Sequence, residues 1–181
     1  ELSGIGHPDL LNAQGIETIS TLPGVGENLQ DHFVIGNRYR MKPGSPSVNQ
    51  QSRGLAMIGE VFKYLIQRKG LLTLSAAHVA AFFKTRPELA TPDVQYHILP
   101  STMDLQKMTE TGDMELEKHP GITIAPCQLR PESRGSVHIK SAHHDAHPAI
   151  RPNYLHAPHP HQTAVAGLSW ARDLAAQPAL A

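Results

Sequence analysis

The spacing of apolar residues along the chain predicts two long helices. Apolar side chains recur every three or four residues between Leu55 and Ile66, which predicts an amphipathic helix over 55–68 that Gly70 ends. We expect this helix to pack on a sheet through Leu55, Ile58, Phe62 and Leu65. A second apolar stripe predicts a closing helix over 161–177; its members are Val165, Leu168, Ala171, Leu174 and Ala175.

Short apolar runs bounded by proline, glycine or charged residues predict strands at 77–84, 93–99, 122–129 and 136–140. Between 37 and 42 apolar and cationic residues alternate, as a half-exposed strand requires. Tyr39 and Met41 are expected on one face of this strand, and Arg38, Arg40 and Lys42 on the other. The run 16–19 predicts one more, brief strand.

The remaining segments read as a helix, a turn and loops. Pro8 and Asp9 suit the first turn of a short helix over 8–14 that Gly15 ends. Two glycines predict a turn at 22–26, and proline, serine and glutamine predict a loop at 43–52. The polar stretch 100–120 is predicted to be irregular, either a functional lid or a mobile loop.

Strands that do not alternate strictly with helices indicate the α+β class, here an antiparallel β-sheet covered by helices. The 181 residues are 40% hydrophobic with a formal net charge of zero, so the composition suits a globular chain and gives no reason to expect a nucleic-acid partner. One cysteine, Cys127, excludes an internal disulfide and fits a reducing compartment. The chain shows no apolar run of about 20 residues. We therefore expect a cytoplasmic protein and leave open a peripheral contact with the inner membrane.

Four blocks in order along the chain carry a resemblance to a known family. The chain resembles the glucose-methanol-choline (GMC) oxidoreductases, flavoenzymes that oxidise alcohols with FAD, and within them the choline dehydrogenase group. The blocks are residues 22–32 (Leu-Pro-Gly-Val-Gly-Glu-Asn-Leu-Gln-Asp-His, preceded by Ser-Gly-Ile-Gly at 3–6), 92–97 (Pro-Asp-Val-Gln-Tyr-His), 129–137 (Leu-Arg-Pro-Glu-Ser-Arg-Gly-Ser-Val) and 148–155 (Pro-Ala-Ile-Arg-Pro-Asn-Tyr-Leu).

The resemblance implies a division of the chain and a fold. Residues 1–32 are expected to be a remnant of the FAD-binding domain and its junction, and residues 33–181 a substrate-binding domain that is incomplete at its carboxy terminus. In this family that domain is an antiparallel sheet that roofs the flavin. Family members are several-fold longer and this chain begins inside a motif, so we expect a piece of a longer protein.

The resemblance also implies which parts of the catalytic machinery to look for. The family's base lies in a His-x-x-Gly-Thr motif, and none of the 12 histidines has that context, so we assign no catalytic residue. The family's FAD fingerprint is likewise missing. Gly24-Val25-Gly26 has Leu29 where a third glycine would stand, and we interpret it as a turn, not a phosphate cradle. The isolated chain is expected to be inactive and to bind FAD weakly at best.

Candidate cofactor-binding residues follow the glycine turn. Similarity implies that Asn28, Gln30, Asp31 and His32 form a loop at the domain junction, close to the flavin. An alternative role for Asn28 and Asp31 is purely structural, because such side chains readily bind neighbouring backbone amides. Both roles can hold together.

Candidate substrate-binding residues lie on the predicted strands. The run His78-Val79-Ala80-Ala81-Phe82 matches a family run in which a glutamate binds the quaternary ammonium of choline. Because His78 replaces that glutamate, an uncharged or anionic alcohol is expected in place of choline; a satisfied interior histidine is the alternative. Alternation places Gln95 and His97 on one strand face; a core-facing or surface histidine is the alternative for His97. Phe82, within the run matched to the family, is a further substrate-binding candidate, and Gln128 is a weaker one at a strand end.

Seven histidines lie between 138 and 161, a density that raises the question of metal binding. Their spacing fits no short metal motif and no thiolate accompanies them, so we expect an exposed histidine-rich loop and no built metal site. Arg134 is expected to hold a strand entry by hydrogen bonds. The histidines are His138, His143, His144, His147, His156, His159 and His161.

The sequence therefore predicts part of an FAD-dependent alcohol dehydrogenase or oxidase that converts a primary alcohol to an aldehyde by hydride transfer to flavin. Its expected partners are a small alcohol, the rest of the parent chain, and oxygen or a quinone as electron acceptor. The alternative is a truncated, non-enzymatic relative that binds a small molecule or a metal through the same scaffold.

Overall fold

A computed structural model describes residues 1–156 and 158–180, with the side chains of 158–160 left undescribed. These residues form two compact units. The first comprises residues 1–33 and 130–163, and the second comprises 34–129 and 164–181. The predicted junction ending at residue 32 concerns the family's domains, not these units, and it stays a prediction.

The first unit begins with helix α1 (Pro8–Ala13) beside the parallel pair β1 (Ile5–Gly6) and β2 (Ser20–Thr21). Helix α1 confirms the predicted helix. The strand predicted at 16–19 is wrong. The backbone N–H of residue 16 donates to the carbonyl of Leu11 at the end of the helix, and strand β2 begins only at Ser20.

The first unit also contains an antiparallel three-stranded sheet in the order β3-β8-β9. Its central strand β8 confirms the strand predicted at 136–140, but β8 pairs with β3 and β9 and does not join the other predicted strands. Its first residue is Gly135, where an added Cβ would lie 2.0 Å from the Arg151 carbonyl oxygen, so only glycine fits this close approach. The bounds are β3 (Glu27–Leu29), β8 (Gly135–His138) and β9 (Ala149–Arg151).

The second unit is built on a four-stranded antiparallel sheet in the order β4-β7-β6-β5. All four strands were predicted, at 37–42, 77–84, 93–99 and 122–129. Strand β4 alternates half-buried and exposed residues as expected from its apolar and cationic pattern. The bounds are β4 (Asn37–Arg40), β5 (Val79–Phe83), β6 (Val94–Leu99) and β7 (Gly121–Gln128).

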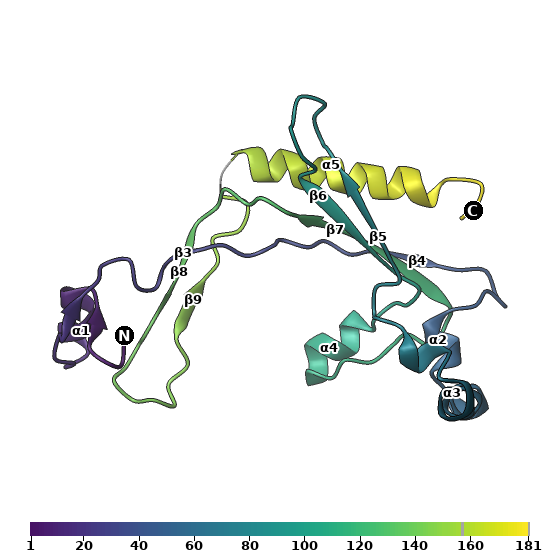
Figure 1. Cartoon of the computed structure of the whole chain (residues 1–181), viewed down its shortest axis with the longest axis horizontal. Coiled ribbons are helices and arrows are strands. Elements are labelled where there is room, and N and C mark those ends of the chain that lie inside the picture. Colours follow the sequence, from purple (N-terminus) through teal and green to yellow (C-terminus); the bar gives the residue numbers. More distant parts are fainter. Residues whose placement is uncertain (157, 181) are drawn as a thin grey trace. The chain divides into compact units, whose positions relative to one another are not determined.

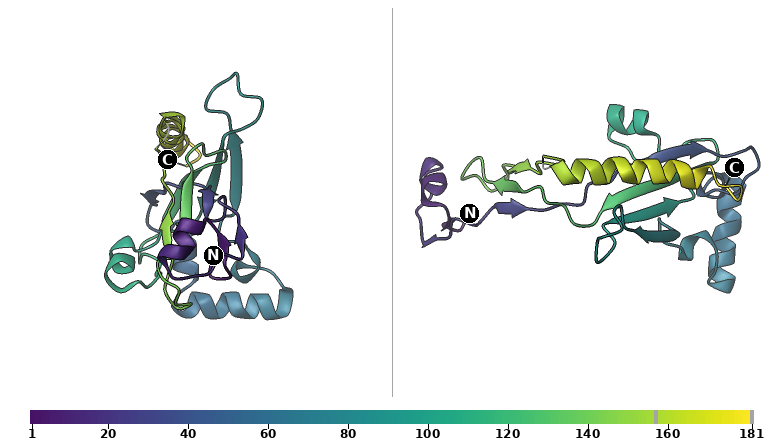
Figure 2. Two further views of the ribbon diagram at one scale, coloured as in Figure 1. Left: turned by 90° about the vertical axis from the view of Figure 1, so that its left-hand side faces the viewer. Right: turned by 90° about the horizontal axis from the view of Figure 1, so that it is seen from above.

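Helix α5 (Pro158–Ala175) covers one face of this sheet (Figures 1 and 2). Its residue Ala171 is buried in a core with Val94, Tyr96 and Ile124. The Tyr96 hydroxyl donates to the Gly167 carbonyl at 2.7 Å, which fixes the helix on the strands. The helix predicted at 161–177 is thereby confirmed, as is the predicted antiparallel sheet covered by a helix. One member of the predicted stripe, Val165, is 52% exposed, because the contact centres on Gly167 and Ala171.

Pro126 interrupts the ladder between β7 and the chain leading into β4. Its carbonyl accepts from the Ile35 N–H at 3.1 Å, so its ring nitrogen, which carries no hydrogen, faces the same side and cannot return a bond. The pairing resumes beyond it at Val34 and Cys127. The backbone N–H that a proline lacks would have pointed toward the chain leading into the edge strand β4. Proline is therefore tolerated in β7, and the pairing of β7 with β6 is not affected.

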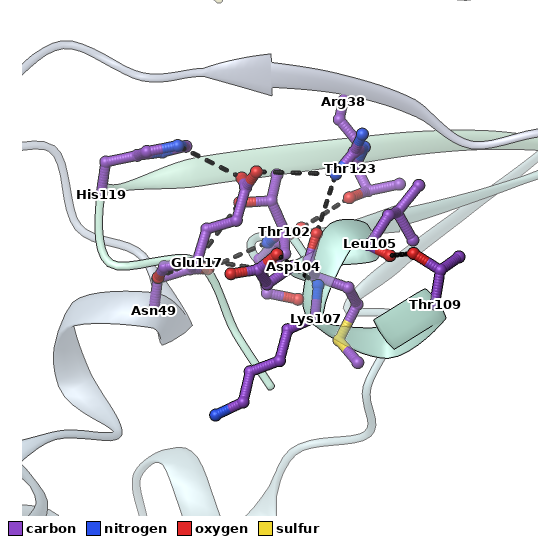
Figure 3. A network of polar contacts seen from close by, with 12 residues as sticks. Arg38, Asn49, Thr102, Asp104, Leu105, Lys107, Thr109, Glu117, His119 and Thr123 are labelled. Atoms are coloured by element: carbon purple, nitrogen blue, oxygen red, sulfur yellow. Dashed lines mark hydrogen bonds and ion pairs between the residues drawn. The ribbon is translucent and has the colours of Figure 1, made fainter. Parts of the chain in front are cut away.

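Segment 100–120 is held in place by buried hydrogen bonds (Figure 3). Asn49 is fully buried; its amide nitrogen donates to the Thr102 and Glu117 carbonyls at 3.0 and 2.9 Å, and its oxygen accepts from the Thr102 N–H at 3.0 Å. Arg38 donates to the Met103 carbonyl at 2.8 Å. The loop predicted at 43–52 contains the short helix α2 (Val48–Gln51), and the irregular segment predicted at 100–120 contains α4 (Leu105–Thr111).

Helix α3 (Gly54–Gln67) confirms the helix predicted at 55–68, and the turn η1 (Leu71–Thr73) follows it. The predicted packing on the sheet is wrong. Leu55 is 86% exposed, Phe62 59% and Leu65 58%, and no residue of the helix is buried. Helical spacing shows that a helix has an apolar face, but it does not show what covers that face.

Candidate functional site on the open face of the sheet

The register of the four-stranded sheet gathers three predicted substrate-binding residues on one face. Phe82 on β5 is the direct partner of Gln95 on β6. His97 lies two residues after Gln95 on β6, and its partner on β5 is Ala80. Because side chains alternate between faces, Phe82, Gln95 and His97 share one face. Buried Val94 and Tyr96 point to the other, under α5.

The three side chains are accessible to a small molecule. Phe82 is 57% exposed, and Gln95 and His97 are half-buried. The floor between them is apolar and tightly packed, since the β7 partners of Gln95 and His97 are Cys127 and Ala125, both buried. An aromatic ring, an amide and an imidazole over an apolar floor can bind the carbon chain of a ligand and hydrogen-bond one polar group on it.

His78 lies one residue before β5, where its backbone N–H donates to the Ile98 carbonyl at 3.1 Å. This bond is offset by one residue from the register that pairs Val79 with Ile98, so the ladder itself ends at Val79. The His78 side chain is exposed, which does not fit the alternative of a satisfied interior histidine. Its role against substrate stays a prediction.

Gln128 is placed apart from the other candidates. It pairs with Val94, so it belongs to the face under α5, and it is only 7% exposed. Gln95 and His97 lie on the opposite face. The structure does not bring Gln128 together with them.

Of the predicted cofactor-binding residues, Gln30, Asp31 and His32 form an exposed loop in the first unit, whereas Asn28 is exposed within strand β3 and not in a loop. The Gln30 amide donates to the Pro131 carbonyl at 3.1 Å, and an Asp31 oxygen accepts from the His32 N–H at 2.9 Å. The other Asp31 oxygen accepts from the Tyr154 hydroxyl, and this hydrogen bond raises the pKa of Tyr154 above its ordinary value. Asp31 thus already serves the structural role that the sequence left open for it, and Gln30 adds a bond to the Pro131 carbonyl.

Asn28 lines a shallow pocket of about 340 Å³ beside β8 and β9. Arg151 and Asn153 line it too, as do Glu27 and Arg134, and the Asn153 amide nitrogen donates to the Arg134 carbonyl at 3.0 Å. The Arg151 guanidinium and the Asn28 amide suit a ligand with anionic or carbonyl oxygens. The Arg134 guanidinium donates to the carbonyls of residues 131, 132 and 133, as predicted for a residue that holds the strand entry. Sequence reasoning missed Arg151, although it stands within a family block.

A second group missed by the sequence surrounds His138. Its Nδ1 lies 2.7 Å from a Glu1 carboxylate oxygen and its Nε2 lies 2.9 Å from a Glu27 oxygen. The hydrogen bond to Glu1 raises the pKa of His138; burial opposes this shift, and Glu27 adds to it. Gly26 makes the approach feasible, because a Cβ there would lie 2.6 Å from the imidazole and 2.8 Å from Glu1.

The other histidines follow the expectation of an exposed loop as far as they are described. His143, His144 and Asp145 are exposed, and one ligand atom from each lies within 4.8 Å of the others. Consecutive exposed residues of this kind capture metal adventitiously, and they do not make a built site. His159 lies outside the residues whose side chains the structure describes.

Comparisons with known proteins agree with the resemblance seen in the sequence. A family model described as GMC oxidoreductase matches residues 131–181. Curated relatives of 32–35% identity align with 97–99% of the chain. The chain is therefore similar to the GMC oxidoreductases, as the four sequence blocks predicted.

The individual relatives share about a third of their sequence with the chain. An alcohol dehydrogenase [acceptor] of Pseudomonas putida is 35% identical over 99% of this chain and 32% of its own length. A fatty acid photodecarboxylase of Chlamydomonas reinhardtii is 32% identical over 97% and 31%. An oxygen-dependent choline dehydrogenase of Xanthomonas euvesicatoria is 33% identical over 98% and 31%. The chain thus spans about a third of the length of the curated relatives it matches.

Solved structures of low sequence identity share the fold. A formate oxidase of Aspergillus oryzae superposes with a TM-score of 0.82 at 20% identity, covering 99% of this chain and 35% of its own. A pyridoxine 4-oxidase of Mesorbium loti superposes with a TM-score of 0.70 at 21% identity, covering 98% and 30%. This likeness confirms the α+β class with antiparallel sheets.

Proposed function

We propose that this chain supplies the substrate-binding wall of an FAD-dependent enzyme that oxidises a primary alcohol to an aldehyde. The observation that carries the proposal is the register that gathers Phe82, Gln95 and His97 on the sheet face opposite α5. Two relatives named as alcohol and choline dehydrogenases support the reaction class.

The roles of the three residues follow from their chemistry. Phe82 provides apolar contact to the carbon chain of the alcohol, while Gln95 and His97 orient its hydroxyl by hydrogen bonds. Bound FAD would supply the acceptor for the hydride. The proton of the hydroxyl requires a base at hydrogen-bond distance, and we leave that role to the family's His-x-x-Gly-Thr motif, which residues 1–181 do not contain.

The first unit offers residues that fit a flavin cofactor. The donors of Asn28, Arg151 and Asn153 line one pocket, and FAD carries carbonyl and phosphate oxygens that such donors can bind. Gln30 and Asp31 would shape the same loop through their bonds to Pro131 and Tyr154. Asn28, Gln30, Asp31 and His32 therefore remain our candidates for the flavin side of the protein.

The substrate is proposed to be an uncharged or anionic alcohol. The exposed imidazole of His78, next to the first residue of β5, offers no fixed negative charge to a quaternary ammonium group. One relative is named a photodecarboxylase, so similarity to the family does not by itself fix the reaction, and the following assay tests it directly.

The test compares Phe82→Ser with Val79→Ser in the full-length protein. The two residues stand on the same strand with similar exposure, 57% and 54%, but alternation puts them on opposite faces. Steady-state kinetics with uncharged primary alcohols should show kcat/KM falling roughly tenfold or more for Phe82→Ser, the effect of losing one apolar contact in the transition state. Val79→Ser should stay within about twofold.

The same assay covers the substrate class and the alternative function. Wild-type protein should prefer an uncharged alcohol to choline, and His78→Glu should move the ratio of the two efficiencies toward choline. Equal losses in both serine variants, at equal flavin content, would show that the open face does not meet substrate. A flavin-loaded, full-length protein that oxidises no alcohol would favour the non-enzymatic alternative.

A further inference from the structure

Tyr154 contacts both chain neighbours of His32. Its hydroxyl donates to an Asp31 carboxylate oxygen, although the two residues lie 123 positions apart along the chain. Its ring also lies 5.3 Å from the Phe33 ring, measured between centroids, at an angle of 44°. The second Asp31 oxygen accepts from the His32 backbone N–H at 2.9 Å. One distant tyrosine therefore holds the chain on each side of the candidate flavin residue His32.

Side-chain contacts determine the conformation of the loop that contains His32. Residues 30–33 follow strand β3 and precede the bridge formed by Val34. The Gln30 amide holds the start of this loop through its bond to the Pro131 carbonyl at 3.1 Å. Tyr154 holds the rest, so the loss of this one side chain would release most of the loop.

The turn that carries Tyr154 has a costly backbone conformation. Asn153 and Leu155, on either side of it, have φ values of 55° and 57°, in the left-handed region. Asparagine tolerates this region, whereas a bulky residue such as leucine rarely adopts it. The Asn153 amide braces the turn by donating to the Arg134 carbonyl at 3.0 Å. Such conformations persist where the surrounding structure holds them, and they are enriched at functional sites.

We propose that Tyr154 is a positioning residue for the flavin cofactor and that it acts by holding His32 in place. This inference rests on the proposed function, in which Asn28, Gln30, Asp31 and His32 lie on the flavin side of the protein. A loop that is already ordered loses little conformational entropy when it meets the cofactor. Without the phenol hydroxyl, the loop would have to be ordered during binding, which lowers the affinity for flavin.

The experiment titrates FAD into flavin-free, full-length protein and follows flavin fluorescence and the visible circular dichroism of the bound flavin. Tyr154→Phe keeps the ring beside Phe33 and removes the bond to Asp31. The dissociation constant should rise roughly tenfold, the effect of one hydrogen bond to a charged group, and the circular dichroism of the flavin should change. Tyr64→Phe, at a half-buried tyrosine of α3 in the second unit, is the matched control and should stay within about twofold.

A double-mutant cycle measures whether Tyr154 acts through His32. His32→Ala should weaken flavin binding by a comparable factor, and Tyr154→Phe should add little to that loss in the double variant. Additive losses would overturn the inference, as would a loss in His32→Ala with none in Tyr154→Phe. Unchanged flavin binding in His32→Ala would overturn the flavin side of the proposed function as well.

The same bond can be tested from the loop. Asp31→Ala removes the acceptor, whereas Asp31→Asn keeps one oxygen for the Tyr154 hydroxyl. Asp31→Asn should therefore retain more flavin affinity than Asp31→Ala, and this difference should disappear when Tyr154→Phe is added. Equal affinities of the two Asp31 variants beside an intact Tyr154 would overturn the inference, even if Tyr154→Phe were itself poorly folded.

Discussion

At the scale of single residues, identical side chains take unrelated roles according to distant partners. His138 is clamped by Glu1 and Glu27, which lie 137 and 111 positions away along the chain. His143 and His144, only a few positions later, lie exposed in a loop. Local spacing grouped all of them as one histidine-rich segment, since residue type and neighbours in sequence carry no information about such long-range pairs.

The His138 clamp should make stability depend on pH. The His138 pKa is raised by Glu1, so the charged contacts contribute fully below the ordinary pKa of 6.5 and are lost as pH rises through the folded-state value. Burial alone would raise the pKa of Glu1, but hydrogen bonds from His138 and the Ile139 amide lower it below 4.5. The Glu1 contribution is therefore present above pH 4.5 and lost on acidification.

Urea unfolding between pH 5 and pH 9 measures this effect. Wild-type protein should lose stability between pH 6 and pH 9, and His138→Gln should show a flatter dependence over that range because glutamine does not titrate. His144→Gln, at a side chain 78% exposed, should keep the wild-type slope. Parallel curves for wild type and His138→Gln would contradict the clamp.

At the scale of elements, one buried side chain holds the segment that the sequence left as a lid or mobile loop. Asn49 on α2 connects that helix with Thr102 and Glu117 at the two ends of the segment carrying α4. Hydrogen bonds of a buried amide are costly to leave unmade, because each stranded partner keeps its desolvation penalty. The segment is therefore an anchored part of the second unit.

Asn49→Ala should lower the free energy of unfolding by about 3 kcal/mol, since the buried partners lose their bonds. Gln50→Ala is the matched control: the neighbouring residue is exposed, with one bond to the Lys118 carbonyl at 2.9 Å, and its loss should cost about 0.5 kcal/mol. Urea denaturation followed by circular dichroism gives both values. Equal effects of the two changes would show that the network does not anchor the segment.

Elements were the scale at which the sequence predicted most. Alternation and bounded apolar runs located the four strands of the large sheet, helical spacing located α3 and α5, and helix-end residues located α1. The same patterns could not say that β8 belongs to a separate sheet or that α3 turns its stripe outward, because partners are chosen by tertiary contacts. Alternation did place Gln95 and His97 on one face, while the face of Gln128 required the register with Val94.

At the scale of the whole molecule, the proposed substrate wall lies in the second unit, and the glycine turn of the first unit does not form a dinucleotide-binding turn. This turn, Gly24-Val25-Gly26, leads into strand β3 and not into a helix, so it presents no helix amino terminus to a pyrophosphate. Gly26 instead makes room for His138 and Glu1. The sequence interpretation of this stretch as a turn is confirmed.

The isolated 181-residue chain should accordingly purify colourless and bind FAD weakly at best. Flavin absorbance of the purified protein and titration of FAD fluorescence measure this directly. Occupancy near one flavin per chain would contradict the prediction and assign the phosphate contacts to residues 24–32 after all. Denatured protein treated in the same way provides the baseline for nonspecific flavin uptake.

The edge of the large sheet also bears on how the protein avoids aggregation. Strand β4 is an edge of the large sheet, and an edge with a long row of open backbone groups is a template for strands of other chains. The regular part of β4 is only four residues long, and Arg38 and Arg40 add positive charge to it. A short, cationic edge strand thereby disfavours pairing with a strand of another chain.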